Sequence, residues 1–183
     1  CSVSLNANSS RTLVGGVCGD AYKSDIKNCT VDMNLTTESG GGVVGKLRKE
    51  CTVSNCTIEG TYYYTEVGSS CVGHTNGVGK IRDCTSSSTV QGDKTIGGIL
   101  GKSNEKTIIQ NCEFTGIARS EETCAGISSI HKGIIEGCTN TGIITSKDIG
   151  GGIVGISKYG PIKNCKNTSL VNCSNIAGGI VGR

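Results

Sequence analysis

The sequence predicts an all-β fold, a parallel β-solenoid of six to seven coils with about 27 residues per coil. Three observations support this prediction: a cysteine recurs at nearly constant spacing, a glycine-rich segment recurs with it, and large side chains are scarce. The 183 residues include 29 glycines but no tryptophan, one phenylalanine and one methionine. Because a fully buried large apolar side chain contributes roughly 1.5–3 kcal/mol, we expect a thin, repeated core rather than one thick core.

Cysteine recurs along the chain at a nearly constant spacing. Seven of the twelve cysteines share one phase, with successive spacings of 28, 27, 28, 28, 26 and 27 residues. In six of the seven, an apolar residue lies three positions before the cysteine, and an Asn, Asp or Gly lies directly before it. Since equivalent residues of stacked coils lie about 4.8 Å apart, these cysteines should form an inward ladder. The predicted ladder consists of Cys1, Cys29, Cys56, Cys84, Cys112, Cys138 and Cys165.

A glycine signature precedes the cysteines and has the pattern glycine, glycine, apolar, apolar, glycine. Clear copies begin at Gly15, Gly41, Gly97, Gly151 and Gly178, and degenerate copies begin at Ser69 and Ala125. The third position should line the core, and it is occupied by Val17, Val43, Cys71, Ile99, Ile127, Ile153 and Ile180. We expect the first two glycines either to adopt positive φ or to let the walls of the coil approach closely.

Short β-branched runs punctuated by glycine and asparagine predict two or three strands per coil. A unit of about 27 residues is too short for a four-stranded propeller blade, and it lacks the period of 3.6 residues that helical repeats show. We therefore expect one solenoid domain over residues 1–183. This domain is either a segment of a longer array or a subunit that stacks end to end into a filament.

The paired segments, such as Gly41–Gly45 followed by Val53-Ser-Asn-Cys56, resemble GLUG-motif repeats. Six or seven copies cover nearly the whole chain. The resemblance implies a secreted or surface-exposed protein, frequently a large bacterial or protist adhesin or a non-catalytic region attached to a secreted peptidase. No catalytic residue belongs to the motif, so the resemblance implies none here.

Twelve cysteines without any C-x-x-C pair indicate an oxidising compartment. Ladder cysteines are expected to be free thiols packed as small hydrophobic groups, with disulfides between adjacent coils as the alternative. Disulfides are more readily expected among the cysteines off the ladder, which are Cys18, Cys51, Cys71, Cys124 and Cys173. N-glycosylation is expected on some of six sequons, at Asn8, Asn28, Asn34, Asn55, Asn167 and Asn172.

A search for reactive groups predicts no enzyme, no metal site and no cofactor. His74 and His131 lie in non-adjacent coils without a ligand-like spacing to other residues. The acidic residues are expected at several different phases of the repeat rather than stacked as a carboxylate pair or cluster; those considered are Asp20, Asp32, Glu59, Asp83, Glu113 and Glu136. The net charge of +3 is dispersed and no apolar run approaches about 18 residues, so neither nucleic-acid binding nor a transmembrane segment is expected.

The resulting hypothesis is a non-catalytic extracellular structural or adhesive protein that self-associates through open terminal coils, with glycans or host cell-surface proteins as further partners. One alternative is a carbohydrate-binding or carbohydrate-active β-helix, for which the rows containing Lys46 and Lys102 or Lys27, Arg82 and Lys163 could meet acidic glycans. A further alternative is an ice-binding solenoid, because a threonine row follows the ladder, although Glu113 and Lys166 interrupt it. The row consists of Ser2, Thr30, Thr57, Thr85, Glu113, Thr139 and Lys166.

Overall fold

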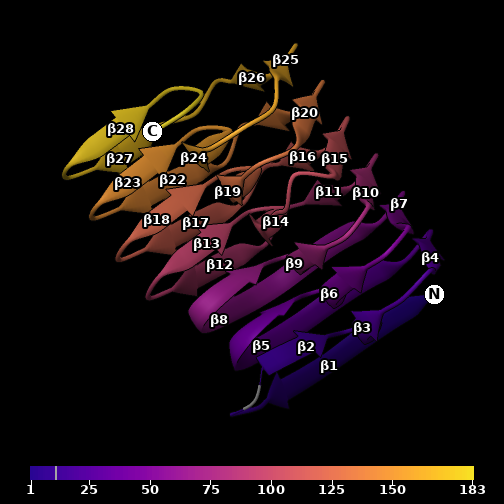
Figure 1. Cartoon of the computed structure of the whole chain (residues 1–183). Coiled ribbons are helices and arrows are strands. Elements are labelled where there is room, and N and C mark those ends of the chain that lie inside the picture. Colours follow the sequence, from indigo (N-terminus) through magenta and orange to yellow (C-terminus); the bar gives the residue numbers. More distant parts are fainter. Residues whose placement is uncertain (11) are drawn as a thin grey trace.

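The computed structural model describes residues 1–10 and 12–183, and within them it contains 28 β-strands and no helix. The chain winds into coils that stack along one axis, with the N-terminus and C-terminus at opposite ends of the stack (Figure 1). Register partners in adjacent coils are 26 to 28 residues apart in the sequence, as in the pairs Cys18 and Val44 or Ser2 and Thr30. The predicted parallel β-solenoid is therefore confirmed.

Three parallel sheets form the walls, and we name them sheets 1, 2 and 3. Sheet 1 has sixteen strands: β1 (Ser2–Asn8), β2 (Thr12–Gly15), β5 (Thr30–Gly41), β8 (Thr57–Ser69), β11 (Thr85–Ser86), β12 (Thr89–Gly92), β13 (Thr95–Gly97), β16 (Glu113–Phe114), β17 (Ile117–Ser120), β18 (Thr123–Ala125), β21 (Thr139–Asn140), β22 (Ile143–Ser146), β23 (Ile149–Gly151), β26 (Lys166–Asn167), β27 (Val171–Cys173) and β28 (Ile176–Gly178).

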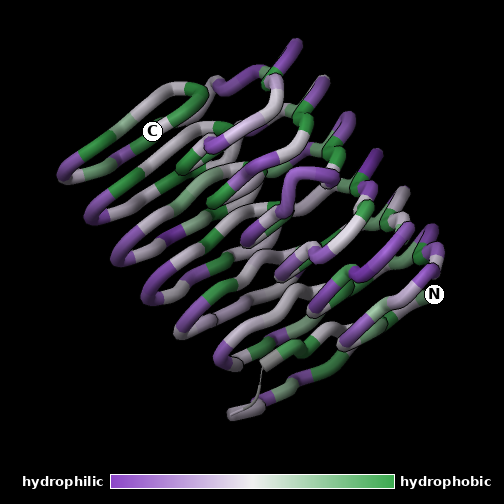
Figure 2. The backbone as a smooth tube through the Cα atoms, viewed as in Figure 1, coloured by the Kyte–Doolittle hydropathy of each residue, from purple (hydrophilic) through white to green (hydrophobic). Residues whose placement is uncertain are grey.

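Sheets 2 and 3 have six strands each. Sheet 2 contains β4 (Asp25–Lys27), β7 (Cys51–Ser54), β10 (Gly79–Arg82), β15 (Thr107–Gln110), β20 (Ile134–Glu136) and β25 (Ile162–Lys163). Sheet 3 contains β3 (Cys18–Ala21), β6 (Val44–Arg48), β9 (Val72–Asn76), β14 (Leu100–Lys102), β19 (Ser128–His131) and β24 (Val154–Ser157). Hydrophilic residues gather at the turns between strands (Figure 2).

A left-handed turn explains why Asn, Asp or Gly precedes the ladder cysteines. Six such residues have φ between 52° and 65°, a region that Asn, Asp and Gly tolerate better than other residues. They are Asn28, Asn55, Asp83, Asn111, Gly137 and Asn164. Each following thiol donates a weak hydrogen bond back across the turn to the carbonyl oxygen two residues earlier, with Sγ···O distances of 3.2–3.5 Å. The turn residue and the cysteine therefore act as one corner unit.

The glycines of the signature serve close approach rather than positive φ. A Cβ on Gly97 would lie 2.0 Å from the carbonyl oxygen of Leu100, and a Cβ on Gly98 would lie 2.5 Å from the ring of Phe114. Neither glycine has positive φ. The first glycine thus permits the tight corner, and the second leaves room for the Phe114 ring.

The core is narrow and continuous. The five third-position side chains of the inner coils are fully buried: Val43, Cys71, Ile99, Ile127 and Ile153. In the outer coils Val17 is half-buried and Ile180 is 37% exposed. The core also contains Tyr62 and Tyr64, whose ring centroids lie 6.4 Å apart with nearly parallel planes. Their phenol groups donate to backbone carbonyl oxygens of Glu59 and Ser69, which satisfies them in the apolar interior.

Candidate functional site

The structure stacks the ladder cysteines in consecutive coils. The amide of Thr57 donates to the carbonyl oxygen of Cys29 at 3.0 Å, and the amide of Thr85 donates to that of Cys56 at 2.9 Å. The same contact repeats up to Lys166 and Cys138. Cys29, Cys56, Cys84, Cys112 and Cys138 are buried, whereas Cys165 is half-buried and Cys1 is exposed.

All twelve cysteines are free thiols in the structure, so the disulfides expected off the ladder are not formed. Cys51, Cys71 and Cys124 are buried, and Cys18 and Cys173 are half-buried. These five lie at different phases of the repeat, so none has a partner cysteine in register. Along the ladder, parallel side chains one coil apart keep their Cβ atoms about 4.8 Å apart, beyond the usual disulfide range of about 3.5–4.5 Å.

Contacts among the buried ladder thiols shift their pKa values in opposite directions. The pKa of Cys112 is raised well above its ordinary value by the contacts with the Cys138 and Cys84 thiols and by burial. Burial also raises the pKa of Cys124. Contacts with neighbouring ladder thiols instead lower the pKa of Cys84 and that of Cys138, the latter to about 4. All of these side chains are buried, so the ladder supplies packing and corner hydrogen bonds.

The six sequons do not share one environment. Asn8, Asn28, Asn34, Asn55 and Asn172 are exposed. Asn167 is half-buried, and its side chain accepts a hydrogen bond from Asn140 Nδ2 at 2.8 Å and donates one to the Ser169 carbonyl oxygen at 3.1 Å. Its amide is therefore occupied within the fold.

One sequence-based expectation about the acidic residues is wrong. Asp32 and Glu59 occupy the same phase, three residues after a ladder cysteine, and β5 and β8 place them in register on adjacent coils. They line neither groove described below. In the part of the chain that the structure describes, no three His, Cys, Asp or Glu side chains are grouped so that they could hold a metal ion.

An outward column of polar residues runs along sheet 1. Each member lies seven residues after a ladder cysteine, and the strands hold the members in register across seven coils. The column consists of Asn8, Thr36, Tyr63, Gln91, Arg119, Thr145 and Asn172. We call it the polar column. The phase of the polar column is visible in the sequence only by counting seven residues from each ladder cysteine, because its members share no single residue type.

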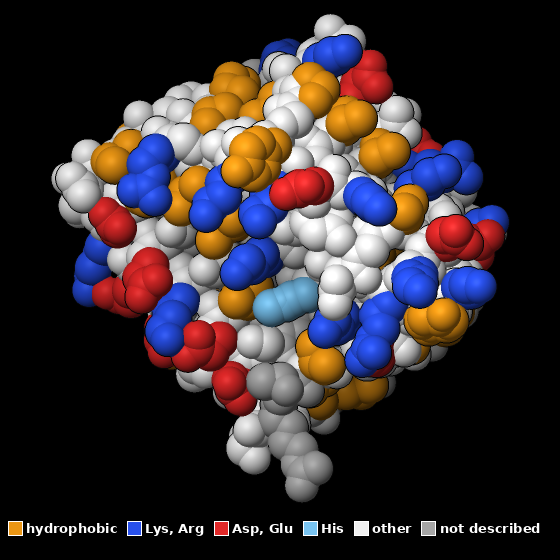
Figure 3. Space-filling model, in the orientation of Figure 1, with side chains coloured by type: hydrophobic (Ala, Val, Ile, Leu, Met, Phe, Trp, Pro, Cys, Tyr) orange, Lys and Arg blue, Asp and Glu red, His pale blue; other side chains and the backbone are white. Residues whose placement is uncertain are grey.

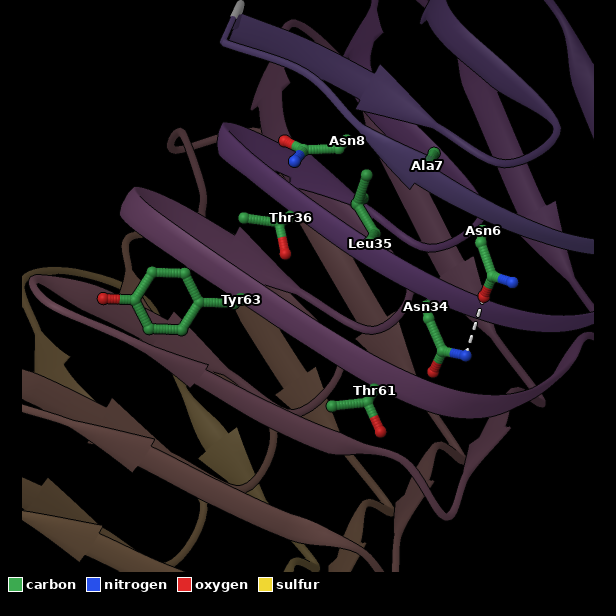
Figure 4. Close-up of a pocket in the computed structure, with 8 residues that line it drawn as sticks. All are labelled: Asn6, Ala7, Asn8, Asn34, Leu35, Thr36, Thr61 and Tyr63. Atoms are coloured by element: carbon green, nitrogen blue, oxygen red, sulfur yellow. Dashed lines mark hydrogen bonds between the residues drawn. The ribbon is translucent and has the colours of Figure 1, made fainter.

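Tyr63 divides two shallow grooves along the polar column. The first, of about 530 Å³, is lined by β1, β5 and β8 and contains Asn6, Asn34 and Thr61 besides the column residues (Figure 4). The second, of about 350 Å³, continues from Tyr63 towards Asn172. Together they follow the axis of the solenoid.

The Tyr63 side chain is exposed between its two buried neighbours Tyr62 and Tyr64, because successive side chains of a strand point to opposite faces. Its hydroxyl donates to Asp93 Oδ1 at 2.7 Å, and this hydrogen bond raises the pKa of Tyr63. At the other end of the first groove, Asn34 Nδ2 donates to Asn6 Oδ1 at 2.8 Å (Figure 4). The first groove therefore offers amides, hydroxyls and one aromatic ring to a ligand.

The stacked coils, the three parallel sheets and the repeated corner units define a parallel β-solenoid repeat protein. The GLUG motif matches residues 10–36, which contain the first glycine signature and the corner at Asn28 and Cys29. The chain therefore contains a GLUG motif within a parallel β-solenoid whose coils repeat the same corner.

No curated protein and no solved structure shows significant similarity to the chain. Over the residues that the structure describes, there is no helix long and apolar enough to cross a membrane.

Proposed function

We propose that this chain is a non-catalytic, extracellular structural and adhesive repeat module. The main support for the proposal is the polar column, an outward row of residues that continues through seven coils without interruption. Neither groove beside it pairs a nucleophile with a histidine base. Five exposed sequons and the resemblance to GLUG-repeat proteins support an extracellular location.

The location is tested by immunogold labelling of the source cells with antibodies against this chain. We expect gold particles on intact, non-permeabilised cells or on material shed from them. Labelling that requires permeabilisation would contradict the proposal. Glycans or host cell-surface proteins are the partners that such a module would meet.

Self-association through the end coils is the second part of this proposal. Strand β1 pairs with β5 on one side, and β27 pairs with β22 on one side, so that each has an edge with no neighbour among the described residues. Unpaired strand edges readily accept a further strand. Either another coil of a longer chain or the end coil of a second copy would satisfy them, and the second case produces a filament.

Carbohydrate binding is the alternative function, and the exposed ring of Tyr63 favours it. Aromatic faces combined with amide and hydroxyl groups suit the apolar faces and hydroxyl groups of sugar rings. Affinity electrophoresis through gels containing xylan, mannan, laminarin or hydroxyethylcellulose tests this. We expect retardation that Tyr63→Ala abolishes, that Tyr63→Phe largely keeps, and that the matched surface variant Tyr159→Ala leaves unchanged. If none of these polymers retards the wild type, this alternative is wrong.

A further inference from the structure

A second surface column, on sheet 3, brings three basic residues together. Register places Lys46 of β6, His74 of β9 and Lys102 of β14 on successive coils, each at the sixth position of a glycine signature or its degenerate copy. Adjacent members are therefore separated by about 4.8 Å along the axis. Lys and Arg side chains gather around a histidine on the face that carries this sheet (Figure 3).

The charge of these lysines is not balanced locally. Asp20 is the carboxylate of the same column, next to Lys46. Its carboxylate is held by Arg48 through two hydrogen bonds, one of them from Arg48 Nε to Asp20 Oδ1 at 2.8 Å. The four ion pairs of the described residues involve Lys27, Arg48, Lys94 and Lys147, and neither Lys46 nor Lys102 is among them.

His74 adds an unsatisfied polar atom between the two lysines. Its ring is half-buried, and Nε2 is shielded from solvent without a hydrogen-bond partner among the described residues. Burial, and then the charges of Lys46 and Lys102, lower the pKa of His74 to about 4. A pocket of about 280 Å³ opens beside the ring and is lined by Leu13, Ser39, Lys46 and His74.

We propose that Lys46 and Lys102 bind an oxyanion beside the ring of His74, the sulfate ester or carboxylate group of an acidic polysaccharide. Two ammonium groups on either side of one imidazole can donate to a single oxyanion in the pocket beside the ring. The charge of the oxyanion offsets the charges of the two lysines. The assignment of the group to a polysaccharide rests on the proposed extracellular role, whereas the oxyanion site itself does not.

The chain contains two histidines, so NMR can observe the site directly. The probe is sodium sulfate, added to protein labelled at histidine Cε1, with sodium chloride at equal ionic strength as the control. We expect the His74 signal to shift in a saturable way with sulfate, and the pKa of His74 to rise by about 1 unit or more, as it does beside an opposite charge. His131 is fully buried on another coil and should not respond, so it also reports any unfolding.

Substitutions at the two lysines test the geometry. Lys46→Gln and Lys102→Gln should each weaken sulfate binding at least tenfold, while Lys80→Gln on sheet 2 should change it less than twofold. The proposal is wrong if sulfate and chloride shift His74 alike, or if the double glutamine variant binds sulfate as the wild type does.

Retention on immobilised heparin and on immobilised polygalacturonate then distinguishes the two sources of the oxyanion. Preferential retention on heparin identifies a sulfate ester, and preferential retention on polygalacturonate identifies a uronate. In both cases Lys46→Gln and Lys102→Gln should elute at lower salt than Lys80→Gln. Sulfate binding without retention on either polymer would refute the polysaccharide assignment. These measurements use purified protein, so their outcome does not depend on the immunogold result.

Discussion

At the scale of single residues, each ladder cysteine combines two structural roles. Its thiol packs in the core, and it also donates across the left-handed turn to the carbonyl oxygen two residues earlier, as Cys84 does to Arg82 at 3.2 Å. A small side chain with a weak donor suits this position, because a larger side chain would not fit between the neighbouring coils.

Replacing one buried ladder cysteine should therefore reduce stability. Cys84→Ala removes the packed sulfur atom and leaves the Arg82 carbonyl without this contact, and we expect a loss of roughly 1–2 kcal/mol in the free energy of unfolding. Cys1→Ala, at the exposed end of the same ladder, should change it by less than about 0.5 kcal/mol. Urea denaturation followed by circular dichroism measures both. Equal midpoints for the two variants would show that the ladder does not stabilise the core.

His131 is fully buried, and both of its ring nitrogens are shielded from solvent. Burial lowers its pKa to about 4, against about 6.5 in an unfolded chain. Between these values the unfolded state binds more protons, so stability is complete above about pH 6.5 and falls as the pH falls to about 4. The full difference corresponds to about 3 kcal/mol.

The variant His131→Leu tests this origin of acid sensitivity. Between pH 6.5 and 4 the stability of this variant should fall less than that of the wild type. The part of the fall that is due to His74 should remain, because the folded pKa of His74 is also about 4. Denaturation midpoints at several pH values measure the difference. If the wild type and the variant show parallel pH profiles, His131 is not a source of the acid sensitivity.

At the scale of the element, the corner unit depends on a residue that accepts positive φ. Asn111 has φ of 53° and is exposed. We expect Asn111→Gly to be nearly neutral, since Gly137 fills the same position one coil later. Asn111→Ala should cost about 1 kcal/mol and Asn111→Val more, because a β-branched side chain disfavours this conformation. Thermal denaturation measures the melting temperatures of the three variants, which should fall in the order Gly, Ala, Val. At an ordinary strand position the Val variant would instead be the most stable of the three.

The elements also show what the sequence can and cannot specify. The cysteine and glycine periods predict the coils, because a fixed period forces equivalent residues into register. The polar column and the row of Lys46, His74 and Lys102 have fixed phases too, so counting from the cysteines or the signature would find them. The burial and hydrogen bonding of such residues cannot be found by counting along the sequence. The shielding of His74 Nε2 and the inward turn of Asn167 depend on how neighbouring walls pack.

At the scale of the whole molecule, the solenoid presents apolar side chains at its two ends. Leu5 on β1 is 39% exposed, and Ile180 in the last coil is 37% exposed, although the residues in register with them in the next coil are in the core. Both would be covered if another coil, from this chain or from a second copy, continued the stack.

Charge at these positions should therefore block end-to-end assembly. For purified protein under oxidising conditions we expect unbranched filaments in negative-stain electron microscopy and large species in sedimentation velocity. Leu5→Lys and Ile180→Lys should each shift the material towards monomer, because a buried lysine without a partner carries a large desolvation cost. The matched control is Ile134→Lys, since Ile134 is also 37% exposed but lies on the side of an inner coil. A wild type that stays monomeric at high concentration would remove the filament proposal, and dissociation by Ile134→Lys to the same extent would show that the contact is not between end coils.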